Sequence, residues 1–182
     1  MAAEDVLEVQ VLRHVFTSER PFAEIMSGIY GGISQPDIGN LFRELRATTS
    51  YEQFTTLVHQ AQGSAGLMRF LELELDSALA LDPRAQSSAG RRLVRLIAGN
   101  PVTMGEMTRH VADAGSYAPV TILVEELPGG GTRLAYDSVV SELAIYDDPA
   151  ATQVAANLDA EVIGLLRHVS GLSPTRDAGT ES

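Results

Sequence analysis

Three acidic residues at alternate positions, Glu72, Glu74 and Asp76, are the part of this sequence best suited to carry chemistry. In a β-strand, side chains two residues apart lie on the same face, about 7 Å apart along the strand. Carboxylates at that spacing can act as a general acid and base or hold a divalent cation. The alternative, which we favour, is the solvated outer face of a half-exposed sheet. Met68 and Phe70 share this predicted face, which indicates that a helix, a loop or a second subunit covers part of it.

One histidine could join these carboxylates. His14 lies on the polar side of a predicted first strand, and it could face Glu72 or Glu74 if the two strands pair. An imidazole beside a carboxylate is a common acid/base arrangement, although a structural histidine on a sheet is commoner. The other three histidines, at positions 59, 110 and 168, stand at no metal-ligand spacing. We therefore expect no metal site, and the candidate catalytic residues are Glu72, Glu74 and His14.

A second candidate site lies where a strand meets a helix, at Asn100-Pro101. Asn100 can cap the helix and Pro101 suits its first turn, with a second capping pair at Thr103 and Glu106 one turn later. Free N–H groups at such a helix start can hold an anion, although a structural turn explains the same residues. We take Asn100, Pro101 and Thr103, together with Glu74, as candidate ligand-binding residues.

Alternation and turn signals predict the elements that would position these residues. Strands are expected at 6–17, 67–77, 93–98, 120–127 and 132–137, the last two forming a hairpin around three glycines. Helices are expected to begin at Pro21, Pro36 and Ser50, and to span 104–111 and 149–169. The segment 82–90 has the composition of a loop, and the residues after position 172 are expected to form a disordered tail.

This order of elements predicts an α+β fold, in which an antiparallel sheet of about five strands has helices packed mainly on one face. The 182 residues fit one domain, which we place at 1–172 with a helical insertion at 34–63. The second helix of that insertion has a capping-box spacing, Ser50 with Gln53, and a predicted buried side formed by Tyr51, Phe54, Leu57 and Val58.

Composition limits the partners. The chain has 13 Lys+Arg against 24 Asp+Glu, a formal net charge of −11, which disfavours nucleic acid and anionic membranes. Its one basic cluster, formed by Arg84, Arg91, Arg92 and Arg95, is more simply a solvated strand end than an anion site. There is no apolar run of membrane-spanning length, no signal-peptide pattern and no cysteine, so we expect a cytoplasmic protein.

Several segments resemble the domain-of-unknown-function 302 (DUF302) family, most closely over 93–169. The strand 93–98 followed by Gly99-Asn100-Pro101, the segment 117–124 with its proline before an apolar strand, the hairpin strand 131–136 and the helix segment 156–159 all look like family segments. The resemblance implies a small α+β protein that pairs as a homodimer. It implies a fold more than an activity, and it identifies no cofactor.

Two departures from the family pattern bear on function. The segment 34–63 stands where compact members pass almost directly from the first helix to the second strand. Many members carry an Asp-His pair at the end of that strand, whereas this chain has Glu74-Leu75. The carboxylate is therefore kept and the imidazole is lost, so any chemistry that the family histidine performs cannot occur here in the same way.

Three functions remain open at this point. The first, which we favour, is a homodimeric protein that binds a small ligand between sheet and helices, or acts as an accessory protein. The second is a cofactor-free or metal-assisted acid/base enzyme using Glu72, Glu74 and His14, which requires these side chains to meet in one concavity. The third is a protein-interaction module that uses the helices of 34–63 as its docking surface.

Overall fold

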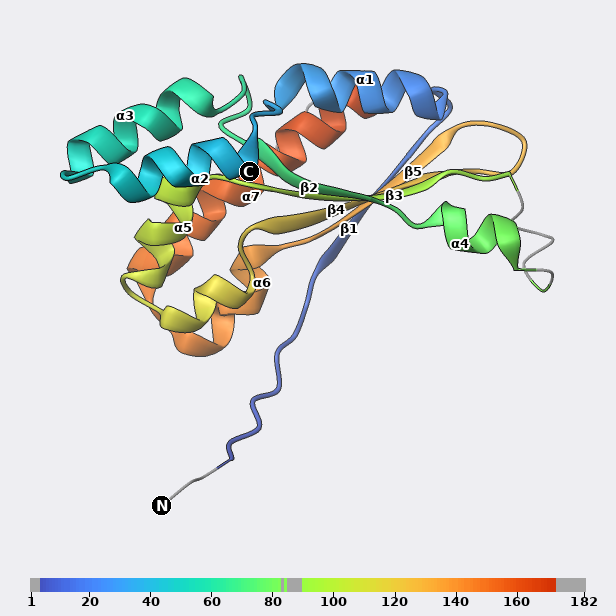
Figure 1. Cartoon of the computed structure of the whole chain (residues 1–182). Coiled ribbons are helices and arrows are strands. Elements are labelled where there is room, and N and C mark those ends of the chain that lie inside the picture. Colours follow the sequence, from blue (N-terminus) through green and yellow to red (C-terminus); the bar gives the residue numbers. More distant parts are fainter. Residues whose placement is uncertain (1–3, 83, 85–89, 173–182) are drawn as a thin grey trace, which may run out of the picture.

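The computed structural model describes residues 4–82, 84 and 90–172 (Figure 1). Its elements follow one another in the order β1 Arg13–Ser18, α1 Phe22–Gly32, α2 Ile38–Ala47, α3 Tyr51–Ala61, β2 Met68–Glu74, α4 Asp76–Leu81, β3 Leu93–Gly99, α5 Pro101–Thr108, the 3₁₀ turn η2 Ala112–Ser116, β4 Val120–Glu126, β5 Thr132–Asp137, α6 Val139–Leu143, the 3₁₀ turn η3 Ala144–Tyr146 and α7 Pro149–Ser170.

The five strands form one antiparallel sheet in the order β1-β5-β4-β3-β2. The predicted α+β fold class is confirmed. Strands β2 to β5 follow one another across the sheet, and β1 is added beyond β5, so the first and second strands of the sequence occupy opposite edges. This order decides which of the candidate side chains can meet.

The main core lies between the sheet and helices α1 and α7. Alternate sheet residues such as Phe16, Leu96, Ile122 and Leu134 are buried there, and they pack with apolar side chains of both helices. Within the described residues, the face of the sheet that points away from this core has no comparable cover, and Val15 on β1 is half exposed. Period-two alternation is what a sheet with one buried face produces.

Helices α2 and α3 form a second apolar cluster. Leu41 and Leu45 of α2 are buried against Val58 of α3 and Met68 of β2. Residues 34–63 therefore form a helical pair with its own small core. Of the side predicted to be buried on α3, Val58 is fully buried while Tyr51 is 65% exposed.

The helix starts show how closely local signals determine boundaries. The Ser50 hydroxyl accepts a hydrogen bond from the Gln53 N–H at 3.2 Å, as the capping-box spacing predicts. The return bond differs, because the Gln53 amide oxygen accepts from the N–H of Thr49, 3.0 Å away, and not from Ser50. Helix α5 begins at Pro101, three residues before the predicted position, because Asn100 is the cap and Thr103 lies inside the helix.

Two predicted strands are shorter in the structure. The first was expected over 6–17, but pairing begins at Arg13, and residues 6–12 extend from the body without a strand partner (Figure 1). The second was expected to reach Ser77, but β2 ends at Glu74 and helix α4 begins at Asp76. Asp76 is therefore a helix residue, and the predicted loop at 82–90 lies largely outside the described residues, as does the tail 173–182. None of the described helices has the length and apolar character to cross a membrane.

Candidate functional site

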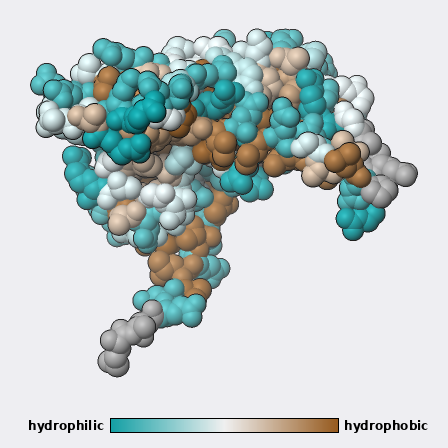
Figure 2. Space-filling view, viewed as in Figure 1, coloured by the Kyte–Doolittle hydropathy of each residue, from teal (hydrophilic) through white to brown (hydrophobic). Residues whose placement is uncertain are grey.

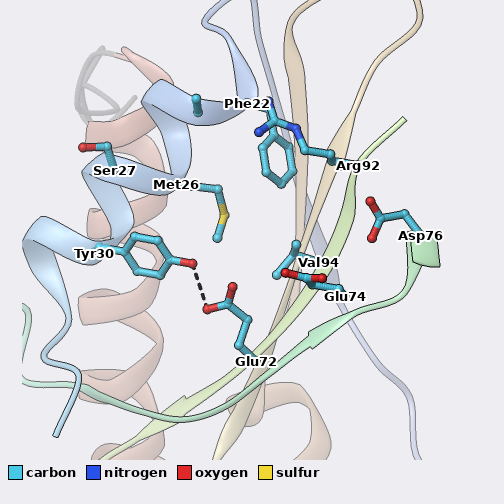
Figure 3. Close-up of a pocket in the computed structure, with 10 residues that line it drawn as sticks. Phe22, Met26, Ser27, Tyr30, Glu72, Glu74, Asp76, Arg92 and Val94 are labelled. Atoms are coloured by element: carbon cyan, nitrogen blue, oxygen red, sulfur yellow. Dashed lines mark hydrogen bonds between the residues drawn. The ribbon is translucent and has the colours of Figure 1, made fainter. Parts of the chain in front are cut away.

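A pocket of about 570 Å³ lies between helix α1 and the edge of the sheet formed by β2 and β3 (Figure 3). The residues that line it come from these three elements, from the start of α4 and from the position just before β3: Phe22, Ala23, Met26, Ser27, Tyr30, Glu72, Glu74, Asp76, Arg92 and Val94. Its volume falls in the range of small-molecule sites. The pocket contains all three acidic residues of the alternating run.

Helix α1 supplies the apolar floor. Phe22, Met26 and Tyr30 are spaced four residues apart, so they lie along one side of the helix. Phe22 and Met26 are buried and Tyr30 is half buried. In Figure 3 the Met26 side chain points into the pocket and the Tyr30 hydroxyl points toward Glu72. The small residues Ala23 and Ser27 are exposed, which leaves the pocket open along the helix.

Strand β2 supplies the carboxylates, and a bulge decides their direction. The pairing of β2 with β3 shifts between Arg69 and Leu71, so the two-residue alternation is interrupted at Phe70. Beyond the bulge Glu72 and Glu74 point toward α1, whereas Leu71 and Leu73 are exposed on the other face. The carboxylates therefore line a pocket, whereas the sequence predicted that they lie on a solvated outer face.

Glu72 has its charge compensated within the site. Its Oε2 atom accepts a hydrogen bond from the Tyr30 hydroxyl at 2.7 Å and pairs with Arg69 at 2.5 Å. The Arg69 guanidinium also lies 5.6 Å from the centre of the Tyr30 ring. Burial, and then the bond to Glu72, raises the pKa of Tyr30 to about 12, so its hydroxyl is a permanent donor at neutral pH.

Glu74 and Asp76 are different, because no described residue forms an ion pair or side-chain hydrogen bond with either carboxylate. The nearby cation, Arg92, is already engaged: it lies 4.3 Å from the centre of the Phe22 ring and 3.2 Å from a carboxylate oxygen of Glu126. That ion pair holds the pKa of Glu126 below its usual range. The pocket therefore combines an apolar floor with two uncompensated carboxylates at its rim.

The structure does not bring His14 to these carboxylates. His14, on β1, pairs with Tyr136 of β5. Strands β1 and β2 are the two edges of the sheet, with three strands between them. Four strand spacings separate the edges, about 19 Å at roughly 4.8 Å each. Instead the His14 ring lies roughly parallel to the rings of Phe16 and Tyr136, with centroids 6.5 and 6.3 Å away. The predicted pairing of His14 with Glu72 or Glu74 across neighbouring strands is therefore wrong.

Asn100, Pro101 and Thr103 lie apart from this pocket at the start of α5. The Asn100 Oδ1 atom accepts bonds from the N–H groups of Val102 and Thr103, 2.9 and 3.4 Å away. Its Nδ2 group donates to Gln62 at 2.8 Å and to the Gly66 carbonyl at 2.9 Å. The N–H groups that were expected to hold an anion thus already have an acceptor. Of the four candidate ligand-binding residues, Glu74 is the one that lines the pocket.

The arginines of the basic cluster also act separately. Arg84 binds Asp82, Arg92 binds Glu126 and Arg95 donates to the Thr121 hydroxyl at 3.2 Å. In the part of the chain that the structure covers, no three acidic or histidine side chains are grouped so as to hold a metal ion. Phe22, Tyr30 and Arg92 were not among the predicted site residues. The spacing of Phe22, Met26 and Tyr30 on one helix face is the signal that could have indicated the two aromatic residues, whereas no local signal indicates Arg92.

Comparisons with known proteins agree with the resemblance found in the sequence. A model of the family described as "Domain of unknown function DUF302" matches residues 43–169. Among solved structures, the fold is similar to the uncharacterized conserved protein DUF302 from Bacillus stearothermophilus, with a TM-score of 0.57 and 12% identity over 86% of this chain and 97% of that chain. At that identity the likeness concerns the fold alone. None of the curated proteins matches.

Proposed function

The chain belongs to the DUF302 family, and from that premise we propose that it is a cytoplasmic, homodimeric protein that binds a small organic cation in the pocket between α1 and β2. The observation that carries this proposal is the combination of an apolar floor, formed by Phe22 and Met26, with two uncompensated carboxylates, Glu74 and Asp76. A ligand with an apolar body and a protonated amine complements both parts.

Charge supports a cation over an anion. The pocket holds three carboxylates and one guanidinium, and that guanidinium is paired with Glu126. An anion would meet Glu74 and Asp76 without gaining a free cation, and the net charge of −11 adds to the repulsion. Acidic side chains that bind a cation are also consistent with the negative net charge of the chain, which disfavours nucleic acid as a partner. The Tyr30 side chain is half buried, and its hydroxyl is held by the hydrogen bond to Glu72. Its aromatic ring can therefore present a face to a cationic ligand.

No observation favours the enzyme alternative to the same degree. The acid/base arrangement required a histidine beside the carboxylates, and the strand order separates His14 from them. Glu72 is occupied by Arg69 and Tyr30. What the pocket offers is recognition of charge and shape, so binding is the function that we propose.

The test compares two probes of similar size and opposite charge, 2-phenylethylammonium and phenylacetate, in calorimetric or ligand-observed NMR titrations at low ionic strength. We expect the cation to bind, at about millimolar affinity for so small a probe, and the anion not to bind. Glu74→Gln should weaken cation binding about five-fold, the effect of one partly exposed ion pair. Glu52→Gln, the same change on the exposed surface of α3, is the matched control.

A second variant separates the pocket from general surface charge. Ala23 is exposed on α1 at the pocket wall, so Ala23→Phe should fill the pocket without disturbing the core and abolish binding. Equal binding of both probes, or equal effects of Glu74→Gln and Glu52→Gln, would contradict the proposal.

A further inference from the structure

No described helix covers the face of the sheet opposite α1 and α7, and this open face carries exposed apolar side chains among its charged ones. We define this open face by Val15, Leu71, Leu73, Arg95 and Leu123. Cross-strand pairing aligns Leu73, Arg95 and Leu123, and the row continues through Ala135 to Val15. Val15 and Leu71 are each 50% exposed. Four of the five side chains in this row are apolar, and such a row on a sheet face that no described helix covers is typical of an interaction surface.

A second unpartnered feature adjoins this face. Residues 4–12, which we call the arm, extend from the start of β1 away from the body (Figure 1). Val6 is 88% exposed and Leu12 is 67% exposed, and hydrophobic surface gathers on the arm in Figure 2. The arm continues the alternating pattern that predicts a strand over 6–17, yet in this chain the strand finds a partner from Arg13 onward. About half of the strand that the sequence predicts over 6–17 therefore has no strand partner among the described residues.

The arm is poorly suited to fold back on its own sheet. Both backbone groups of Leu12 are hydrogen-bonded. Its N–H donates to the Ser141 hydroxyl at 2.9 Å, and its carbonyl accepts from the Ser138 N–H at 2.9 Å. Residues 6–14 include no glycine, proline, asparagine, aspartate or serine, and their valines favour extended backbone. A reversal at this point would need turn residues that the sequence does not have. The arm can therefore reach about 30 Å outward, toward another molecule.

The open face carries a groove that complements the arm. The groove, about 540 Å³, is lined by apolar Leu123 and Ala135, by Arg95 and Arg133, and by the acidic Asp137 and Glu142. Asp137 is paired with Arg13, and Arg133 is paired with Glu125 at 3.4 Å. Arg95 is exposed, and its hydrogen-bond partner is the neutral Thr121 hydroxyl; no described carboxylate pairs with it. The arm carries Glu4, Asp5 and Glu8 between its apolar residues. A groove with one guanidinium that no described carboxylate neutralises matches an acidic apolar segment of the same protein.

We propose that the arm of a second copy of this chain lies in the groove of the open face, with its Glu8 carboxylate beside Arg95, and that two copies exchange arms in this way. The exchange buries the valines and leucines of the arm and the row across β2, β3 and β4. The inference rests on the homodimer in the proposed function and adds its interface. The ligand pocket lies on the α1 side of the sheet, so ligand binding and arm exchange fail independently.

Charge reversal tests the interface on the full chain. Light scattering during gel filtration should show a dimer for the native protein. Arg95→Glu should weaken dimerisation about ten-fold or more, and adding Glu8→Arg to it should restore the dimer. Arg46→Glu, an exposed arginine on α2, is the control and should change nothing. A native monomer at about 100 μM would overturn both the dimer and its interface, and an unaffected Arg95→Glu dimer would overturn the interface alone.

Crosslinking identifies whose arm occupies the groove. Because the chain has no cysteine, single substitutions report cleanly. Copies with Val9→Cys mixed with copies with Leu123→Cys should form a disulfide-linked heterodimer on oxidation. Copies with Val9→Cys mixed with copies with Gln153→Cys, on α7, should not. If instead one chain carrying both Val9→Cys and Leu123→Cys crosslinks internally at high dilution, the arm covers its own sheet and the proposal is wrong.

Discussion

The buried carboxylate of Asp159 is expected to be a principal stabilising group of this fold. Asp159 lies on α7 and is 8% exposed. Its Oδ1 atom accepts from the Tyr136 hydroxyl at 2.6 Å and the Val139 N–H at 3.0 Å. Its Oδ2 atom accepts from the Ser138 hydroxyl and from the Val140 N–H at 3.3 Å. One side chain thus caps the first turn of α6 and ties α7 to the end of β5.

The substitution Asp159→Asn keeps the shape and removes the charge. The amide oxygen can keep two of the four bonds, now without charge assistance, at a cost of about 1 kcal/mol each. The amide NH₂ replaces Oδ2 and faces the Ser138 hydroxyl and the Val140 N–H, so one buried donor loses its acceptor at a further cost of about 2 kcal/mol. The free energy of unfolding should therefore fall by about 4 kcal/mol, which lowers Tm by roughly 12 °C for a protein of this size.

Urea unfolding followed by circular dichroism measures this loss, and an unchanged m-value shows that only stability changed. The matched control is Asp148→Asn on the same helix. The Asp148 side chain caps α7 through one bond, from the Ala151 N–H at 2.8 Å, and Asn caps as well as Asp. Tyr136→Phe should also be non-additive with Asp159→Asn, since the two share a bond. If Asp159→Asn costs no more than Asp148→Asn, the carboxylate network does not hold these elements together.

Three further outcomes are expected. Gly63→Ala should destabilise by several kcal/mol in urea unfolding, because an added Cβ would lie 2.6 Å from the Ser34 nitrogen, whereas Gly31→Ala has open space and should stabilise α1 by about 0.5–1 kcal/mol. Burial raises the pKa of Glu142 to about 7, so the free energy of unfolding should fall as pH rises from about 4.5 to 7. With allowance for solvent screening, Glu142→Gln should raise the free energy of unfolding by about 1 kcal/mol at pH 8 and leave it unchanged at about pH 4. Asn100→Ala should lower the free energy of unfolding by about 2–3 kcal/mol without any rescue by sulfate, because Asn100 caps α5; rescue by the anion would point to a binding site there.

Local signals predicted most of the fold. The β4–β5 hairpin was predicted by its glycine-rich turn, since Gly129, Gly130 and Gly131 all adopt positive φ angles. The long helix α7 follows from its apolar stripe, and α3 from the Ser50 cap. These elements depend on residues near one another in the sequence, where propensity and periodicity act directly.

The candidate site depended on information that periodicity does not contain. The direction of Glu72 and Glu74 was set by the bulge at Phe70 and by where α1 packs, neither of which alternation reveals. The distance from His14 to Glu72 was set by strand order, because β1 joins the sheet beyond β5. The bond from Tyr30 to Glu72 joins residues 42 positions apart and exists because α1 crosses the edge of the sheet.

The most direct test of the proposed cation binding uses the methionine methyl groups as reporters of where a ligand binds. The chain has five methionines, of which Met26 lies in the pocket while Met68 and Met107 are fully buried elsewhere. In ¹³C-methyl NMR spectra, titration with 2-phenylethylammonium should shift the Met26 signal and leave the Met68 and Met107 signals in place, and phenylacetate should shift none of them. A Met26 signal that stays still at saturating cation, or that responds equally to the anion, would contradict the proposed cation-binding function.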